Sequence, residues 1–201
     1  MVNPLACYET EVTIEPAKHP KRIAVVGAGP AGLAFSTTAA ARGHEVTLFE
    51  ADSEIGGQFN MAKTIPGKEE FYETLRYFRH RISETKVNLR LNTRVSSEDL
   101  SDGFDAVILA TGVVPRALNL PGIDHPMVLS YLDLLKHKAS VGNRVALIGA
   151  GGIGFDVAEY LTHQTHEGDP VDAYLEEWGV DRRMSTPGGL KEAGDSEPAR
   201  Q

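Results

Sequence analysis

Short apolar runs recur along the chain, and each of them predicts a β-strand. Three runs are rich in β-branched and aliphatic residues, as strands of a buried parallel sheet are, and a fourth alternates polar and apolar positions. The three aliphatic runs are residues 22–26, 45–50 and 105–112, and the alternating run is residues 87–95. A fifth run opens the stretch VALIGAGGIGFDVAEYL (145–161), which reads as a buried strand, a glycine turn and the start of a helix.

Helical patterns lie between these runs. An alanine-rich helix follows the first strand and ends at Gly43, and a second helix over 68–82 carries one apolar stripe, made of Phe71, Leu75, Phe78 and Ile82. Residues 131–138 predict a short helix. A further helix is predicted to begin with Asp169 as its N-cap and Pro170 as its first residue, and to end at Gly179. Strands alternating with helices predict an α/β fold with a Rossmann-like parallel sheet.

Composition narrows the class of protein. Of the 201 residues 41% are hydrophobic and 24% are charged, which is typical of a globular protein. The net charge of −8 argues against nucleic acid or an anionic membrane as a partner. The chain shows no secretory signal pattern and no apolar run of membrane-spanning length, so a cytoplasmic protein is expected. The single cysteine, Cys7, excludes an internal disulfide.

The turn after the first strand carries the spacing G-x-G-x-x-G. Gly27 permits a tight turn, Gly29 lets the backbone approach a pyrophosphate, and Gly32 lets the helix pack closely on the strand. The N-terminus of the helix supplies free N–H groups for the phosphates. Glu50 follows Gly32 by 18 residues and ends the next strand, where it would accept hydrogen bonds from ribose hydroxyls. A carboxylate there repels a 2′-phosphate, so NADP is not expected at this first site.

Two further features favour FAD as the dinucleotide. Gly56 and Gly57 follow Glu50 with five residues between, a spacing that resembles the extended FAD fingerprint of flavoproteins with two dinucleotide domains. VILATG (107–112) resembles the second flavoprotein hallmark, a strand whose end, here Ala110, Thr111 and Gly112, comes near the cofactor.

EIGGQFNMAKTIPGKEEFYETLRYF (54–78) and LPGIDHPMVLSYLDLL (120–135) resemble a more specific family, and VNPLACYETE (2–11) also fits it. These are iron–sulfur flavoenzymes that join an Old-Yellow-Enzyme-type barrel to an FAD/NADPH module, and the resemblance is strongest to the bacterial NADPH-dependent 2,4-dienoyl-CoA reductases. It implies that hydride passes from NADPH to FAD, and electrons then pass through a four-iron–four-sulfur cluster to FMN, which reduces a dienoyl-CoA of fatty-acid β-oxidation. The barrel and its FMN site are absent from this sequence.

The resemblance also implies which residues contact FAD: Ala31, Glu50, Gln58, Lys68 and Val95. Ala31 would offer its N–H at the helix start, Gln58 and Lys68 could reach the flavin side or the phosphates, and Val95 could meet the adenine through its main chain. Lys68 could equally be a solvated residue of the next helix's first turn. The last cluster cysteine of the family would precede this chain, so Cys7 is expected to be a bystander.

The second fingerprint consists of Gly149, Gly151 and Gly154, and the resemblance places NADPH there. The strand expected to follow, with the basic residue that would grip the 2′-phosphate, does not appear before Gln201, nor does the family's distal FAD segment. We therefore expect a leader over 1–22, an incomplete FAD-binding domain over 23–142, and over 143–201 a truncated start of an NADPH-binding domain that binds NADPH weakly at best.

Several alternatives remain open. An amine-dehydrogenase-like module with FAD and a bound ADP, a nucleotide-binding module without redox chemistry, and a small NAD(P)H:flavin oxidoreductase would all use these glycine turns. His163 and His166 have a spacing that suits a metal, but they are expected to be solvated because no third ligand is near. No catalytic residue and no metal site are predicted, and Tyr131 and Asp133 are expected to pack or to cap a helix.

Overall fold

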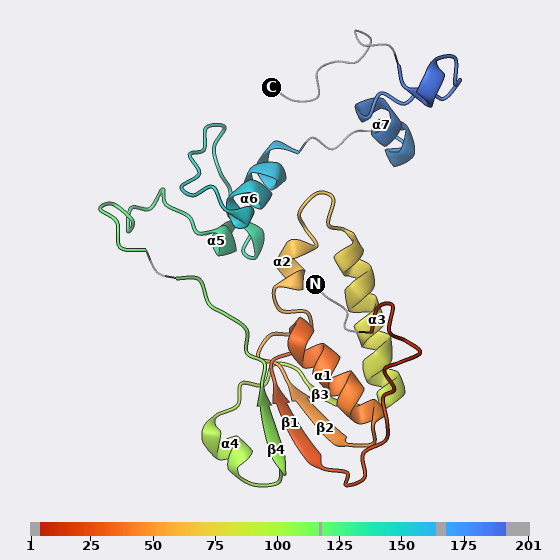
Figure 1. Ribbon diagram of the computed structural model, residues 1–201. Coiled ribbons are helices and arrows are strands. Elements are labelled where there is room, and N and C mark those ends of the chain that lie inside the picture. The colour runs from red at the N-terminus through yellow and green to blue at the C-terminus, as the bar shows by residue number, and fades with distance from the viewer. Residues whose placement is uncertain (1–4, 117, 164–167, 192–201) are drawn as a thin grey trace. The chain divides into compact units, whose positions relative to one another are not determined.

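The computed structural model describes residues 5–116, 118–163 and 168–191, and the chain forms two compact units, residues 1–161 and 162–201. The first unit contains a four-stranded parallel sheet of order β3-β2-β1-β4 (Figure 1). Its strands are β1 (Arg22–Val26), β2 (Glu45–Phe49), β3 (Asn88–Arg90) and β4 (Ala106–Leu109). β1 is central, with Val25 paired to Leu48 of β2 and to Ile108 of β4. The predicted α/β fold with a Rossmann-like sheet is confirmed.

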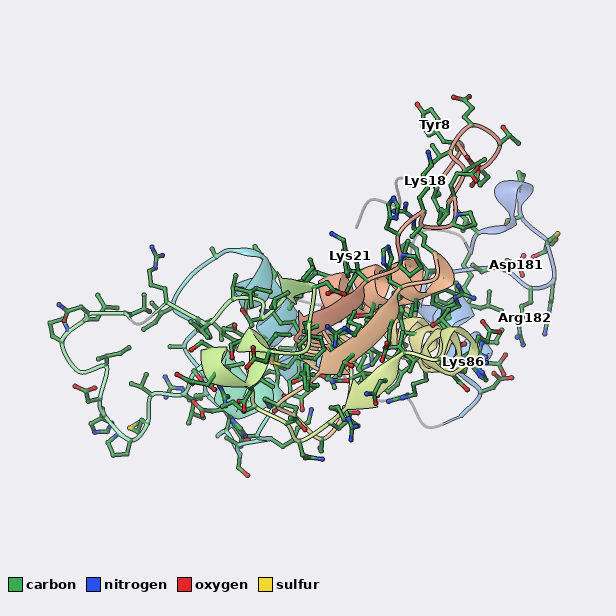
Figure 2. The ribbon with its side chains drawn as sticks, turned by 90° about the horizontal axis from the view of Figure 1, so that it is seen from below. Tyr8, Lys18, Lys21, Lys86, Asp181 and Arg182 are labelled. Atoms are coloured by element: carbon green, nitrogen blue, oxygen red, sulfur yellow. The ribbon has the colours of Figure 1, made fainter. Side chains whose placement is uncertain are left out.

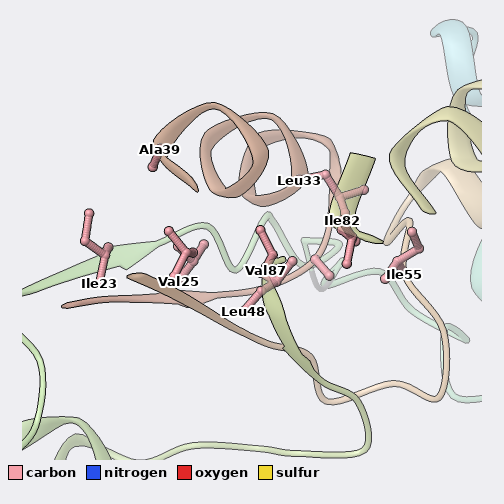
Figure 3. Close-up of a cluster of buried hydrophobic side chains, with 10 residues drawn as sticks. Ile23, Val25, Leu33, Ala39, Leu48, Ile55, Ile82 and Val87 are labelled. Carbon is pink, nitrogen blue, oxygen red and sulfur yellow. The ribbon is translucent and has the colours of Figure 1, made fainter. Parts of the chain in front are cut away.

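One face of this sheet is covered by α1 (Pro30–Ala41) and α3 (Glu70–Thr85), which also pack on each other. The core lies between this face and the helices (Figure 3), because alternate residues of β1 and β2 point towards α1. It is built from Ile23, Val25, Ala28, Leu33, Ala39, Val46, Leu48, Ile55, Ile82 and Val87. The stripe predicted on 68–82 is confirmed, since Leu75 and Ile82 are buried and Phe71 stacks on Phe59 with ring centroids 4.6 Å apart.

The loops of the first unit hold the remaining helices. α2 (Phe59–Ala62) follows the second glycine pair, and α4 (Ser97–Ser101) precedes β4; neither was predicted. α5 (Tyr131–Leu135) begins at Ser130, whose hydroxyl and Asp133 form a capping box, so the expected capping role of Asp133 is confirmed. α6 (Gly152–Thr162) follows the second glycine turn. A second apolar cluster joins α5 and α6 to Ile65.

Two of the predicted strands differ in the structure. The strand predicted over 87–95 ends at Arg90, because Asn92 adopts φ 53° and turns the chain away from the sheet. The strand predicted at Val145 does not form, although α6 begins where the pattern indicates. A strand needs a hydrogen-bonded partner, and the described residues supply none for 145–148. Apolar side chains of this stretch are consequently exposed, with Ile148 79% accessible.

The leader folds onto the end of α1. The Nε of Arg42 donates to the carbonyl of Glu15, and the carbonyl of Arg42 accepts the N–H of Ala17, both at 2.8 Å. Lys21, at the entry to β1, donates its N–H to Nδ1 of His44 at 3.1 Å. The part of the leader that carries the exposed Tyr8 projects from the sheet (Figure 2).

The second unit contains α7 (Pro170–Glu177), and Asp169 caps it as predicted by accepting the N–H of Val171. A 3₁₀ turn at Pro187–Gly189 and an isolated antiparallel bridge between Val180 and Leu190 follow. In the parts of the chain that the structure describes, no helix is long and apolar enough to cross a membrane. The predicted boundary between residues 142 and 143 rests on function and stays a prediction.

Candidate functional site

The first glycine loop lies at the carboxyl edge of the sheet, between β1 and α1. Because β2 and β4 flank β1 on opposite sides, the order of the strands reverses here, and ligands of open α/β sheets bind at such a point. Gly27 has φ 103°, and a Cβ on it would collide with the carbonyl of Ala110. A Cβ on Gly32 would collide with the carbonyl of Gly27. Both positions therefore require glycine for close backbone contact.

Gly29 differs from its two neighbours. A Cβ on Gly29 would meet no atom within 4 Å, so the side of Gly29 on which a side chain would lie is open. Gly29 is also the N-cap of α1, and no side chain caps this helix end; Pro30 follows, and the first turn holds no acidic residue. The N–H groups of this turn, Ala31 among them, are therefore available to a ligand, and the helix dipole favours an anion. This open backbone at an uncapped helix start fits a pyrophosphate.

Glu50 directly follows β2 and lies beside the loop. One carboxylate oxygen accepts the N–H of the fully buried Ala28 at 2.7 Å, and the other accepts the N–H of Asp52 at 2.9 Å. Its own backbone is tied to β3, because its N–H donates to the carbonyl of Arg90 at 2.9 Å. Glu50 is thus held rigidly at the end of β2, where the sequence predicted a ribose-binding acid.

The second glycine pair folds back onto this loop. The N–H of Gly56 donates to the carbonyl of Ala28 at 2.8 Å, and a Cβ on Gly57 would lie 3.1 Å from the Cα of Gly29. Gln58 is the N-cap of α2, and its Nε2 donates to the carbonyl of Val113 at 3.4 Å. The fold therefore brings Gly57 and Gln58 to the same edge as the first loop.

The end of β4 completes the arrangement. The N–H of Ala110 donates to the carbonyl of Val26 at 2.8 Å, and its own carbonyl lies against Gly27. Thr111 and Gly112 continue from this point and are exposed. Three segments far apart in the sequence, which were predicted separately, thus meet around one glycine loop.

Two of the predicted residues lie elsewhere in the arrangement. Lys68 binds both carboxylate oxygens of Asp156 on α6, at 2.6 and 2.7 Å, so its ammonium is engaged away from the first loop. Val95 follows the turn at Asn92 and is half-buried outside the sheet. Contacts of these two residues with FAD stay predictions.

Hydrogen bonds that hold the loop of Glu50 in place were not predicted from the sequence. Beyond β3, the N–H groups of Asn92 and Thr93 donate to the carbonyls of Asp52 and Glu50, at 3.0 and 2.8 Å. These bonds fix the loop that carries Glu50, the predicted ribose-binding acid. The signal in the sequence was Asn92, because asparagine tolerates a left-handed backbone better than most residues.

The second glycine turn repeats the local geometry of the first. Gly149 has φ 116°, a Cβ on Gly154 would lie 2.5 Å from the carbonyl of Gly149, and Gly151 faces open space as Gly29 does. The turn exists without its strand, and a shallow hollow lies over it, lined by Leu147, Gly149, Ala150, Gly154, Phe155 and Ala158.

Perturbed carboxylates lie away from these turns. Hydrogen bonds from the backbone N–H of Arg22 hold the pKa of Asp105 below its usual range, and the hydroxyl of Ser130 does the same for Asp133. Both groups are structural. Among the described residues no three His, Cys, Asp or Glu side chains are placed to hold a metal ion. His166 lies outside the described residues.

Comparison with known proteins agrees with this geometry. Residues 21–175 match the model of the family described as pyridine nucleotide-disulphide oxidoreductase. The chain is 37% identical over 155 residues to bilirubin reductase of Mediterraneibacter gnavus, covering 77% of this chain and 24% of that protein. It is 37% identical over 158 residues to N,N-dimethylglycine/sarcosine dehydrogenase of Chromohalobacter salexigens, covering 74% and 23%.

The structure is similar to a chain of 2-naphthoyl-CoA reductase in complex with 2-naphthoyl-CoA. The TM-score is 0.75 at 34% identity, over 80% of this chain and 25% of that one. The chain thus spans about a quarter of the length of these relatives. Together with the geometry of its first glycine loop, these matches show that the chain belongs to the pyridine nucleotide-disulphide oxidoreductase family and forms an FAD- and NAD(P)-binding portion of a flavoprotein oxidoreductase.

Proposed function

We propose that this chain is the FAD- and NADPH-binding portion of a multi-cofactor reductase. The whole protein would transfer hydride from NADPH through FAD, a four-iron–four-sulfur cluster and FMN to a 2,4-dienoyl-CoA. The observation that carries the FAD assignment is the meeting of Gly57, the end of β4 and the first glycine loop at one edge of the sheet. A glycine turn used only for packing would not need Gly29 open and the helix end uncapped.

The residues divide the binding of FAD between them. Gly29, Ala31 and Gly32 would hold the pyrophosphate at the start of α1, and Glu50 would hold the ribose hydroxyls. Gly57 and Gln58, with Ala110, Thr111 and Gly112, would border the flavin half. When bound, FAD supplies a group that takes a hydride and releases electrons one at a time. The residues of this chain bind and orient it.

The second turn would receive NADPH through Gly149, Gly151 and Gly154. Its backbone geometry supports nucleotide binding, whereas the absence of a strand over 145–148 and the exposed apolar residues there support the expectation that binding by this chain is weak.

The substrate class is supported by the resemblance and by two relatives whose names state a reduction, one of them the reduction of a CoA thioester. The similarity to N,N-dimethylglycine/sarcosine dehydrogenase supports the alternative, in which the module serves the oxidation of an amine. The two activities differ in the direction of electron flow. Anaerobic mixing of the complete flavoprotein with NADPH and a 2,4-dienoyl-CoA, or with dimethylglycine alone, separates them by which compound changes the flavin spectrum.

The FAD assignment is tested on the chain itself. FAD added to the purified chain should bind with a shift in its visible absorbance, and Gly29→Ala should prevent this without unfolding the protein. A chain that takes up no FAD at micromolar concentration would overturn the assignment. NADPH added afterwards under anaerobic conditions should bleach the flavin slowly or not at all, because the second turn lacks its strand.

A further inference from the structure

We propose that two ion pairs clamp the second glycine turn to the loops of the first, so that FAD bound at the first turn orders the helix of the second. The pairs are Lys68–Asp156 and Lys136–Asp52. This inference rests on the proposed function only in taking FAD as the ligand of the first turn. The ordering of α6 by the clamp is independent of that ligand.

The first connection runs from the second glycine pair to α6. Gly57 lies against Gly29, and the chain continues through α2 to Ile65 and Lys68. Lys68 donates to both carboxylate oxygens of Asp156, which lies two residues after Gly154 in the first half of α6. Both carboxylate oxygens lie within hydrogen-bond distance of one ammonium, so this contact holds the first half of α6 close to the loop that carries Lys68.

The second connection starts at the ribose-binding acid. Glu50 accepts the N–H of Asp52, and the carboxylate of Asp52 is 3.0 Å from Nζ of Lys136, which ends α5. Leu134 and Leu135 of α5 are buried in the cluster that contains Val157 of α6. The second connection therefore reaches the same helix through α5.

An apolar cluster joins the segments that carry the two ion pairs. Ile65, which precedes Lys68 by three residues, is 2% accessible and packs in the cluster with Leu134, Leu135 and Val157. The clamp thus combines a buried apolar cluster with two charged contacts. The strand before Gly149 does not form, so this clamp supplies the support for α6 that a paired strand would give it.

Charge and exposure set the size of the effect. The Lys68 and Asp156 side chains are 38% and 33% accessible, so their ion pair is partly screened and weak as a source of stability. A weak ion pair between the loop at Lys68 and α6 still changes how often α6 separates from that loop. If FAD at the first turn favours the state in which the ion pairs are formed, then by linkage it also favours the state in which α6 is held in place.

The experiment is hydrogen–deuterium exchange of the whole chain, read at the amides of residues 152–162 with and without FAD. Asp156→Asn removes the charge of the pair, Asp156→Glu keeps it, and Glu73→Gln is the matched control, because it removes one carboxylate from an exposed ion pair within α3. Without FAD, Asp156→Asn should speed exchange of α6 by about two- to fivefold, while the other two variants should stay close to wild type.

With FAD, exchange of α6 should slow in the wild type, in Asp156→Glu and in Glu73→Gln, and it should slow by a smaller factor in Asp156→Asn, where only the connection through Lys136 remains. If FAD binds, as its absorbance reports, and α6 of the wild type exchanges at the same rate as before, the coupling is wrong and the FAD assignment stands. If FAD does not bind, the proposed function fails. The comparison of α6 exchange between Asp156→Asn and the wild type without FAD still tests whether the ion pair holds α6. Equal exchange of α6 in Asp156→Asn and in the wild type would overturn the clamp.

Discussion

The carboxylate of Glu50 accepts the backbone N–H of Ala28 at 2.7 Å, so the acid at the end of β2 is joined to the first glycine loop. Ala28 is fully buried, and its N–H would otherwise lack a partner at the base of the loop. Glu50 therefore has two tasks at once. It holds the loop in shape, and in the proposed function its remaining lone pairs accept hydrogen bonds from a ribose.

Glu50→Gln is expected to weaken FAD binding by about tenfold or more, because hydrogen bonds to a charged acceptor contribute more than those to a neutral amide. The measurement is a titration of FAD fluorescence with the purified chain. Glu45→Gln, at the exposed start of β2, is the matched control and should bind FAD as the wild type does. Equal affinity of Glu50→Gln and wild type would show that the ribose does not use this acid.

Two glycines of the first loop should respond oppositely to alanine. Gly32→Ala puts a Cβ into the carbonyl of Gly27, and we expect it to lower Tm by about 5 °C or more. Gly29→Ala has room for its Cβ at an ordinary φ of −72°, so its Tm should change by no more than about 3 °C. It should nevertheless abolish FAD binding, because the Cβ occupies the space of the pyrophosphate. A Gly29→Ala variant that binds FAD normally would place the cofactor elsewhere.

NADPH is expected to bind the isolated chain weakly, because the second turn lacks its strand and its hollow is shallow and apolar. Isothermal titration calorimetry should give no saturable heat at micromolar NADPH. Micromolar binding that is lost with NADH, and is therefore dependent on the 2′-phosphate, would contradict this expectation.

Asp181 predicts an effect of pH on the second unit. The hydroxyl of Ser185 and the N–H groups of Arg183, Ser185 and Thr186 donate to its carboxylate and lower its pKa to about 2. Because the folded pKa lies below the ordinary value of 3.8, the carboxylate stabilises this loop above about pH 4. That contribution is lost as the pH falls towards 2.

The amide NMR signals of Arg183 and Ser185 should therefore titrate near pH 2 and remain constant from pH 5 to 7. In Asp181→Asn, the same signals should lose this titration. A midpoint close to 4 in the wild type would show that the carboxylate is not held by these donors.

Replacing Ser36 by alanine is expected to stabilise the fold. Its hydroxyl is fully buried on α1, and it has no hydrogen-bond partner among the described residues. Ser36→Ala removes this unpaired group, so Tm should rise by about 2 °C or more. Thr37→Val, the neighbouring control, removes a hydroxyl that already donates to the carbonyl of Leu33 at 2.8 Å, and it should give no such gain. A fall in Tm for Ser36→Ala would reveal a partner for the hydroxyl.

Local sequence patterns were sufficient to predict the elements that depend on neighbouring residues. The turn at Gly27, the cap at Asp169 and the stripe on α3 depend on a few neighbouring residues, and each forms as predicted. The glycine spacing at Gly149 likewise produces its turn, because the close contact between Gly154 and Gly149 is local.

Which strands find a partner, and which side chains contact one another, depends on the tertiary fold. The run at Val145 has the composition of a strand, but a strand exists only with a partner, and the described chain provides none. Lys68 lies near Gln58 in sequence, yet a carboxylate 88 residues away binds it. Such pairings depend on the path of the whole chain, because the charge of a lysine can be met by any acid that the fold brings within reach. That path also joined Glu50 to Ala28, a bond that no local pattern indicates.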